Sequence, residues 1–173
     1  TAFAYLNLAG IHYARDQFAE AARMYEQAVM NQPADRLAWI DLGDARFWAG
    51  DPEGAATAWH EAERLVDERL AVNAQDLEAR ALLAALLARL GERARARTLL
   101  ADLTPRADLS TDALLDLAKA WEILGDRPRA LHYLQSALER GHAPAVLAFS
   151  AWLDDLRTDP AYARLLRQTL PGS

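Results

Sequence analysis

The chain has 173 residues, of which 52% are hydrophobic, and it carries a formal net charge of −6. This length suits one domain or a short array of repeats, and the acidic balance argues against a nucleic-acid-binding surface. The absence of cysteine excludes disulfides, thiolate metal ligands and cysteine nucleophiles. No apolar run approaches the length of about 18 residues that indicates a membrane-spanning helix, so membrane insertion is not expected.

The first residue is Thr1 rather than Met, and no secretory signal peptide is visible. We therefore expect the chain to be an excised part of a longer protein. We expect a cytoplasmic location, although the lack of cysteine does not by itself fix the compartment.

A pattern of large and small residues recurs four times along the chain. A shift of 34 residues superimposes Leu8 on Leu42, and a shift of 41 then superimposes Leu42 on Leu83. A further shift of 34 superimposes Leu83 on Leu117. The sequence therefore predicts four repeats, at about residues 1–34, 35–75, 76–109 and 110–142.

Each repeat predicts two antiparallel helices joined by a short turn. In the second repeat, Trp39, Leu42 and Gly43 are three and four residues apart, so they share one helix face. Ala55 and Trp59 likewise share a face of the following helix. Small residues on such faces let two backbones approach, and large residues fill the space beside them.

Turn chemistry indicates where the second helices begin. In the segment GDPE, Gly50 ends one helix, Asp51 is suited to cap the next, and Pro52 suits its first turn. The segments GDRP at 125–128 and TDPA at 158–161 have similar residues. We therefore expect helices to begin at all three places.

Two parts of the chain depart from the regular repeat. The 41-residue spacing adds seven residues, nearly two helical turns or about 10 Å. We place this extension in the second helix of the second repeat, over 59–73, with the turn at 73–76. Beyond residue 141 the pattern fades into two expected helices, 143–156 and 160–169, which form a capping pair within 143–173.

The spacing resembles the tetratricopeptide repeat, whose pattern is W-x2-L-G-x2-Y, then Ala, an aromatic residue, Ala and Pro within 34 residues. The first repeat supplies Tyr5, Leu8, Ala9, His12, Phe18, Ala21, Tyr25, Ala28 and Pro33. The second supplies Trp39, Leu42, Gly43, Gly50, Ala55, Trp59 and Ala62. Arg46 and Arg80 replace usual aromatic residues, and Leu103 replaces a usual small one. The resemblance implies an all-α fold, a right-handed α-solenoid of helix-turn-helix repeats.

No arrangement typical of an enzyme is found. The four histidines are far apart, and no phosphate-binding glycine loop, metalloprotease motif or nucleophile elbow occurs. His12 and Asp16 are four residues apart, but His12 also fits an aromatic position of the repeat. The adjacent Asp154 and Asp155 diverge on a helix, so a solvated surface is favoured over a metal site. We expect no catalysis, cofactor or bound metal.

Two further features have both a functional and a structural interpretation. The arginines of ERARAR at 92–97 would bind an anion or form a solvated helix face. Arg93 and Arg97 are four residues apart but Arg95 points elsewhere, so the solvated face is favoured. Trp121 and Trp152 would be ligand platforms or core residues. Both fit core positions of the repeat or the cap, which favours the core interpretation.

In such solenoids the first helix of each pair lines the concave surface. Residues one helix face round from the packing positions are candidate ligand contacts: Leu6, Asn7, Tyr13, Ile40, Asp41, Asp44, Trp48, Glu78, Asp112, Asp116 and Lys119. The earlier members are mostly apolar or aromatic, and the later ones are mostly acidic. Exposed aromatic residues beside charges suit a peptide-binding site. The competing interpretation is that the acidic surface serves solubility alone.

The resemblance implies non-catalytic binding of a protein or peptide in the concave groove. We expect a ligand that is extended or helical, partly apolar and neutral to basic, and we expect no nucleic-acid partner. Related repeats clamp acidic chaperone tails with Lys, Arg and Asn, and no matching position here is basic, so no binding of such tails is predicted. The segment 153–166 is also similar to the tail of repeat regions in bacterial serine/threonine kinases and transcriptional regulators. The alternative is therefore a regulatory or self-association segment of such a protein, and the oligomeric state stays open.

Overall fold

The computed structural model describes residues 1–141 and 150–169, and all regular structure in these residues is helical. The predicted all-α fold is confirmed. The chain divides after Ala74 into two compact units, which are described one at a time.

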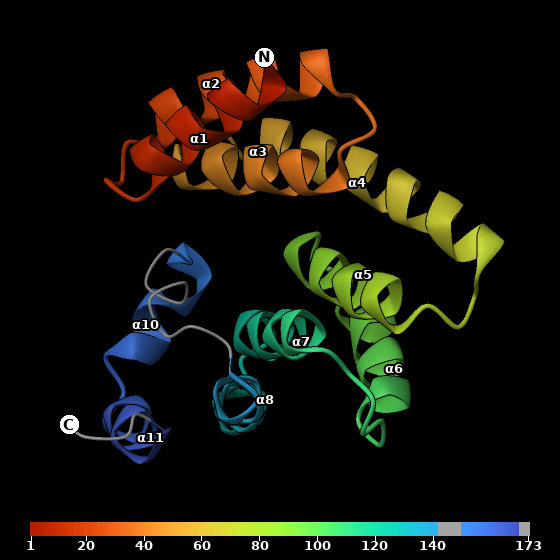
Figure 1. The fold of residues 1–173 in the computed structure, drawn as a ribbon, viewed down its shortest axis with the longest axis vertical. Coiled ribbons are helices and arrows are strands. Elements are labelled where there is room, and N and C mark those ends of the chain that lie inside the picture. The colour runs from red at the N-terminus through yellow and green to blue at the C-terminus, as the bar shows by residue number, and fades with distance from the viewer. Residues whose placement is uncertain (142–149, 170–173) are drawn as a thin grey trace. The chain divides into compact units, whose positions relative to one another are not determined.

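The first unit consists of two antiparallel helix pairs, visible as the red to yellow ribbons of Figure 1. Its helices are α1 (Ala2–Tyr13), α2 (Phe18–Asn31), α3 (Arg36–Trp48) and α4 (Pro52–Val72). Helix α1 packs on α2, α2 on α3, and α3 on α4. Helix α4 has 21 residues, whereas α2, the second helix of the first pair, has 14.

Alternating small and large side chains hold these helices together. Ala9, Ala21 and Ala58 are buried without measurable exposure, and Tyr25 and Leu42 fill the space between them. Alanine lets the helix backbones approach closely, so that the larger side chains meet at interior packing density.

Arg46 stands where the repeat pattern favours an aromatic residue, and polar contacts take the place of ring packing there. Its Nη2 donates to Glu26 Oε1 at 2.8 Å on α2, and its Nη1 donates to the carbonyl oxygen of Gly54 at 3.1 Å on α4. The side chain therefore links α3 to both of its neighbours in the first unit.

In each turn between the two helices of a pair, one recurring position has a left-handed backbone conformation. Gly50, Gly91 and Gly125 have φ angles of 88°, 77° and 79°. Asp16 takes the equivalent position in the first pair with a φ of 57°, where a residue with a Cβ is less favourable than glycine. Each of these residues ends a first helix and turns the chain toward the second.

The predicted helix caps are confirmed at three places. The Asp51 side chain accepts from the backbone N–H of Gly54, and the Asp126 side chain accepts from that of Arg129. Asp159 accepts from the backbone N–H of Ala161 at 2.8 Å. These bonds satisfy N–H groups that have no partner inside a helix.

The second unit has two more helix pairs and a C-terminal segment, drawn in green to blue in Figure 1. Its elements are α5 (Leu77–Arg89), α6 (Arg93–Leu103), α7 (Thr111–Ile123), α8 (Arg127–Glu139), the 3-10 turn η1 (Ala151–Leu153), α10 (Asp154–Arg157) and α11 (Pro160–Thr169). Helix α5 packs on α6 and α7, α7 packs on α8, and α11 covers α8. Leu153, Leu156 and Leu165 join the core of this unit.

The expectation of a continuous helix over 143–156 is corrected in its described part. Residues 142–149 lie outside the described residues. Ser150 has extended backbone angles, and only a 3-10 turn and one short α-helix follow before Thr158. Arg157 donates to the carbonyl oxygen of Ser150 at 3.1 Å, so a side chain supplies a bond that a continuous helix would supply from its backbone. The second expected helix, 160–169, is confirmed as α11.

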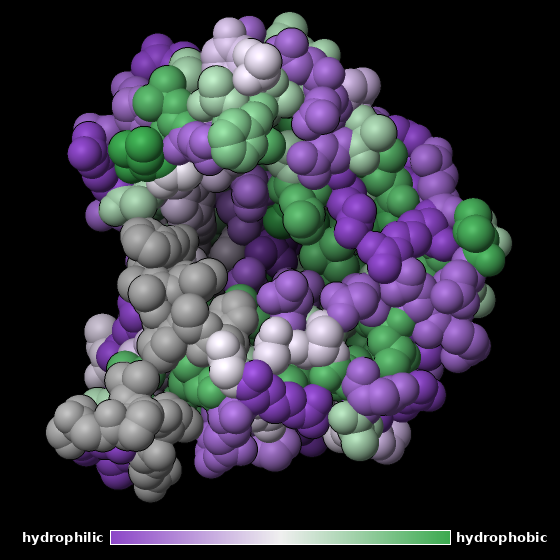
Figure 2. Space-filling view, in the orientation of Figure 1, coloured by the Kyte–Doolittle hydropathy of each residue, from purple (hydrophilic) through white to green (hydrophobic). Residues whose placement is uncertain are grey.

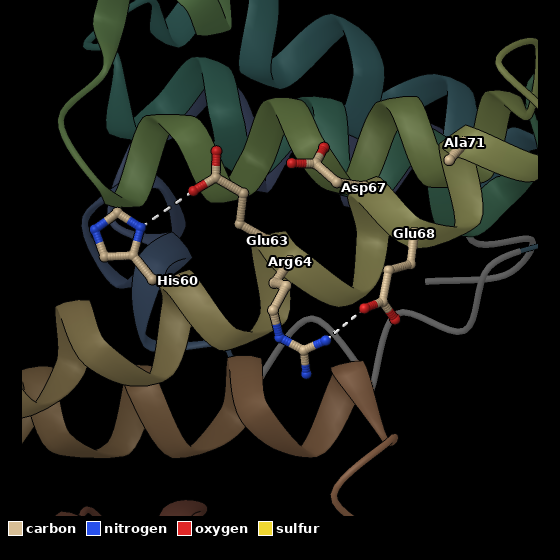
Figure 3. A pocket seen from close by; sticks show the side chains of 6 residues that line it. All are labelled: His60, Glu63, Arg64, Asp67, Glu68 and Ala71. Carbon is tan, nitrogen blue, oxygen red and sulfur yellow. Dashed lines mark hydrogen bonds and ion pairs between the residues drawn. The ribbon is translucent and has the colours of Figure 1, made fainter.

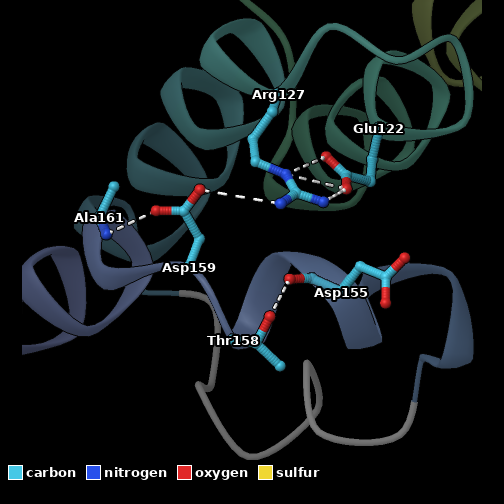
Figure 4. A network of polar contacts seen from close by, with 6 residues as sticks. All are labelled: Glu122, Arg127, Asp155, Thr158, Asp159 and Ala161. Atoms are coloured by element: carbon cyan, nitrogen blue, oxygen red, sulfur yellow. Dashed lines mark hydrogen bonds and ion pairs between the residues drawn. The ribbon is translucent and has the colours of Figure 1, made fainter.

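A network of partly buried ion pairs joins the C-terminal segment to the last helix pair (Figure 4). The Arg127 guanidinium, at the start of α8, lies 2.5 Å from Glu122 Oε1 of α7 and 3.8 Å from Asp159 Oδ2. Asp159 in turn caps α11 through its bond to Ala161. Since one arginine contacts α7 and the turn before α11, it links three elements of the second unit.

Candidate interaction surfaces

Seven of the predicted contact residues belong to the first unit, and the structure places them in three environments. Asn7, Asp41 and Trp48 are exposed to solvent, Leu6 and Tyr13 are partly buried against the core, and Ile40 and Asp44 are buried. The exposed and partly buried residues reach the surface of the first unit. Ile40 and Asp44 are held mainly inside the protein.

Aromatic rings form a connected cluster across the first unit. The centroids of Tyr13 and Phe18 lie 5.1 Å apart in an edge-on arrangement, and those of Phe18 and Trp48 lie 6.3 Å apart. Phe47 then contacts both Trp48, at 5.3 Å, and Trp59, at 5.7 Å. Tyr13 and Trp48 are thus brought together through Phe18, which was recognised as a repeat position but not as a contact residue. The sequence signal for this contact is that Phe18 is the first residue of α2, which follows the helix that ends at Tyr13.

Asp44 has a partner inside the first unit. The indole Nε1 of Trp59 donates to Asp44 Oδ1 at 3.0 Å, and Asp44 is only 7% exposed. Burial, together with the charges of Asp41 and Asp44, raises the pKa of the Tyr25 hydroxyl. The carboxylates therefore lie near Tyr25, and of the two acidic residues Asp41 is the one that faces solvent.

The other four predicted contact residues lie in the second unit, on the first helices of its two pairs. Glu78 on α5 and Asp112 on α7 are exposed, while Asp116 and Lys119 on α7 are about one-fifth exposed. Lys119 Nζ lies 4.0 Å from Asp116 Oδ1. Three of these four predicted residues are therefore acidic, and Lys119 lies beside Asp116, the least exposed of the three carboxylates.

The charges on this surface influence one another. Burial raises the pKa of the Asp116 carboxyl, Lys119 and Arg89 lower it, and Asp112 and Glu78 raise it further. The charges of Glu78 and Asp112 therefore lie close enough to Asp116 to affect the pKa of its carboxyl. Arg89 stacks over the Trp152 ring at 5.6 Å, so a partly buried tryptophan borders the same surface.

The arginines at 92–97 have contacts within the second unit. Arg93 donates to the carbonyl oxygen of Leu124 at 2.7 Å, and Arg95 lies 2.5 Å from Glu92. Arg97 stacks over Trp121 at 5.9 Å. These contacts support the interpretation as a solvated helix face, and Trp121, only 4% exposed, is a core residue as predicted.

Two hollows occur on the surfaces of the separate units. The first, of about 560 Å³, is lined only by residues of α4: His60, Glu63, Arg64, Asp67, Glu68 and Ala71. Figure 3 shows its side chains engaged with one another, since His60 Nδ1 lies 3.1 Å from Glu63 and Arg64 lies 2.5 Å from Glu68. The second, of about 400 Å³, lies between α5 and α6 and is lined mainly by Leu83, Leu87 and Leu99 with Arg95 and Asp102 at its edge. Neither hollow brings together a nucleophile, a base and an oxyanion-stabilising group.

Two physical properties of the described residues bear on the possible functions. Residues 1–141 and 150–169 contain no helix that is both long and apolar enough to cross a membrane. Within the same residues, no three His, Asp or Glu side chains are grouped as metal ligands would be.

Successive antiparallel helix pairs, with small residues at the contacts and capped turns between the helices, define an all-α helical-repeat protein. The family model for the tetratricopeptide repeat matches residues 1–29, which are α1 and most of α2. Residues 1–29 therefore match a tetratricopeptide repeat, and the resemblance that the sequence pattern predicted is confirmed for this part of the chain. This repeat suggests a scaffold for interaction with other proteins.

Two solved structures are similar to this chain at low sequence identity. One is the crystal structure of YrrB, described as a TPR protein with an unusual peptide-binding site; it is 16% identical, with a TM-score of 0.45, over 98% of this chain and 84% of that one. The other is a tetratricopeptide repeat protein from Parabacteroides merdae, 14% identical, with a TM-score of 0.44, over 98% of this chain and 71% of that one. No curated protein matches the sequence.

Proposed function

We propose that the chain is a non-catalytic scaffold that binds a protein or peptide through the first helices of its repeats. The observation that carries the proposal is the pairing of the exposed Trp48 with Asp41, seven residues earlier on the same helix. Two helical turns separate them, about 10 Å, so an aromatic anchor and a charge share one face of α3. Anchors contribute burial, and charges set orientation and rate of association.

The chemistry of both units supports a ligand that is partly apolar and neutral to basic. In the first unit, Tyr13, Phe18 and Trp48 offer aromatic area, and Asp41 is an exposed carboxylate of the same unit. In the second unit, Glu78 and Asp112 are exposed carboxylates. An acidic nucleic acid or an acidic chaperone tail would be repelled by these charges.

The test is selection of peptides from a random phage library on the immobilised chain, followed by calorimetry with the synthesised peptides. We expect enriched peptides to combine an apolar anchor with Lys or Arg. Changing the exposed Asp41 and Asp112 to Lys should weaken binding about tenfold and flatten its salt dependence. Glu68→Lys, an exposed carboxylate on α4, is the matched control and should change affinity less than about twofold.

Two results would count against the proposal. One is a failure to enrich any peptide above the level captured by the surface without protein. The other is an affinity that is equally affected by Glu68→Lys and by the Asp41 and Asp112 changes, because the predicted surfaces would then not be distinguished from the rest of the acidic protein.

A second candidate function is a regulatory or self-association segment of a larger cytoplasmic signalling protein in bacteria. It is supported by the similarity of residues 153–166 to repeat regions of bacterial kinases and transcriptional regulators. In this segment, Leu153 and Leu156 are core residues of the second unit. Reading the coding sequence upstream of Thr1 tests it: a kinase or DNA-binding region there supports this candidate, and a stand-alone reading frame contradicts it.

A further inference from the structure

Two arginines from different helices of the second unit stack on one tryptophan near the end of α7. Arg97 lies on α6 and Arg129 lies in the first turn of α8. Their guanidinium carbons are 5.9 Å and 4.6 Å from the ring centroid of Trp121. Both arginines are exposed, whereas the tryptophan is only 4% exposed. Three helices therefore bring two cations to the same ring.

Arg97 differs from the other arginines of its segment in having no polar partner. Arg93 donates to a backbone carbonyl and Arg95 pairs with a glutamate. In the described part of the chain, Arg97 forms no ion pair or hydrogen bond, and its contact is with the tryptophan ring. The segment as a whole forms a solvated helix face, but its last arginine meets a second cation that comes from another helix.

Positive charge exceeds negative charge around this ring. Arg129 pairs with Asp126 at 2.7 Å. Arg93 reaches the same turn, where its Nη2 donates to the carbonyl oxygen of Leu124 at 2.7 Å. Three guanidinium groups thus gather at Trp121 and the turn after α7, and Asp126 is the carboxylate that pairs with them. This local excess of cations contrasts with the net charge of −6 of the whole chain.

The tryptophan ring also has a donor without an acceptor. The indole Nε1 of Trp121 is buried, and no group in the described residues accepts its hydrogen bond. A buried indole N–H usually has a hydrogen-bond partner. Guanidinium groups are donors as well. The group that would complete this arrangement is therefore an acceptor with negative charge.

The polar character of the second unit and the amount of excess charge indicate the kind of anion. Figure 2 shows hydrophilic residues over much of the visible face of this unit, with smaller hydrophobic areas between them. A phosphoryl group carries a charge of about −1.5 to −2 at neutral pH, which suits two guanidinium groups better than the single charge of a carboxylate does. Its oxygens also fit the planar donor fork of arginine.

We propose that Arg97 and Arg129, stacked on Trp121, form a binding site for a dianionic phosphoryl group, with Arg93 at its edge. Stacking restricts the guanidinium groups before the anion arrives, so less side-chain entropy is lost on binding. The site uses α6 and α8, the second helices of their pairs. It is therefore independent of the peptide-binding surface proposed for the first helices.

Titration of the ¹⁵N-labelled chain with inorganic phosphate, followed by NMR at pH 7 and constant ionic strength, tests the site. We expect the Nε–H signals of Arg97 and Arg129 and the indole N–H signal of Trp121 to shift and saturate, with a dissociation constant of about 1 mM. Chloride over the same range should produce no saturating shift. This titration of the unmodified chain locates the anion without depending on any variant.

The double variant Arg97→Gln with Arg129→Gln should weaken phosphate binding by about tenfold or more, because it removes both charged donors. Arg23→Gln with Arg95→Gln is the matched control. It removes two arginines that pair with exposed or partly exposed glutamates, and it should change the affinity by less than about twofold. Circular dichroism establishes that each variant is folded.

A parallel titration with N-acetyl-phosphoserine amide distinguishes two sources of the phosphoryl group. Tighter binding than that of inorganic phosphate assigns the group to a phosphorylated side chain, and equal or weaker binding assigns it to free phosphate; both results support the site. Shifts that do not saturate overturn the proposal. Binding that is unchanged in the Arg97 and Arg129 variant, or equally weakened in the control variant, also overturns it, since the anion then contacts another surface.

Discussion

The indole ring of Trp59 occupies the space that a side chain at Gly43 would need. A Cβ added to Gly43 would lie 2.3 Å from Trp59 Cδ1 and 2.3 Å from Nε1. Helices α3 and α4 therefore pack there through a glycine and the largest side chain in proteins. The sequence pattern predicted this small-to-large contact, and the structure confirms it.

Gly43→Ala should destabilise the protein by about 1–3 kcal/mol, because the tryptophan has to move out of a packed position. Chemical denaturation measures the change. Gly10→Ala is the matched control: it lies on an open helix surface, so alanine there should be neutral or stabilise by about 0.5–1 kcal/mol. Equal effects at both positions would contradict the role assigned to the Trp59 contact.

Asp44→Ala should cost about 1–3 kcal/mol of unfolding free energy, since it removes the buried acceptor of the Trp59 indole N–H. Asp41→Ala, three residues earlier and exposed, should change stability by less than about 0.5 kcal/mol. Thermal and urea unfolding of the two variants provide the comparison. Similar losses from both would mean that the hydrogen bond to Trp59 does not distinguish them.

Asp16→Gly should stabilise the protein by about 0.5–1 kcal/mol, because Asp16 has a φ of 57° at a turn position where the later pairs have glycine. The opposite change, Gly50→Ala, places a Cβ at a φ of 88° and should destabilise by about 1–2 kcal/mol. The melting temperatures of both variants report the sign. A destabilised Asp16→Gly variant would show that the aspartate side chain outweighs the backbone preference.

Arg127→Ala should destabilise the second unit by about 1–3 kcal/mol, because the Glu122 side chain, only 9% exposed, loses its partner. The contact with Asp159 is lost as well, so we expect faster hydrogen exchange in α11. Arg23→Ala, which breaks an exposed pair with Glu20, is the control and should have little effect. Unchanged exchange in α11 would argue against the link between α8 and the C-terminal segment.

The carboxyl of Asp116 should lower stability at neutral pH. Burial raises its pKa in the folded protein, so the folded state binds the proton more readily than the unfolded chain does. The contribution of this group to unfolding free energy therefore rises as the pH falls through the folded pKa, and levels off below the ordinary pKa of an aspartate.

Asp116→Asn tests this dependence. We expect a higher melting temperature than the wild type at pH 7, and the difference should shrink as the pH approaches 4, where the wild-type carboxyl gains its proton. Asp112→Asn, on the exposed side of α7, should show a smaller effect. A loss of stability at pH 7 in Asp116→Asn would mean that attraction to Lys119 and Arg89 exceeds the cost of burial.

Much of the local structure was predictable because it depends on neighbours in sequence. Two helices begin at Pro52 and Pro160, and both starts were predictable from the aspartate before each proline. Proline suits the first turn of a helix because it has no backbone N–H that would lack a partner there. The division of Trp39, Leu42 and Gly43 onto one face follows from the 3.6-residue period. The left-handed turn conformation of Asp16 was not predicted, because an aspartate, unlike a glycine, does not by itself indicate a left-handed backbone.

The candidate contact residues show what the sequence leaves undecided. Asp41 and Asp44 are both acidic, belong to the same helix and were predicted from the same reasoning, yet one is exposed and the other is bonded to Trp59. Helical period sets the direction of a side chain about its own axis. The packing of α4 on α3 decides which side chains of α3 contact another residue and which contact water. Burial depends on two packed elements, whereas the helical period of the sequence describes a single helix.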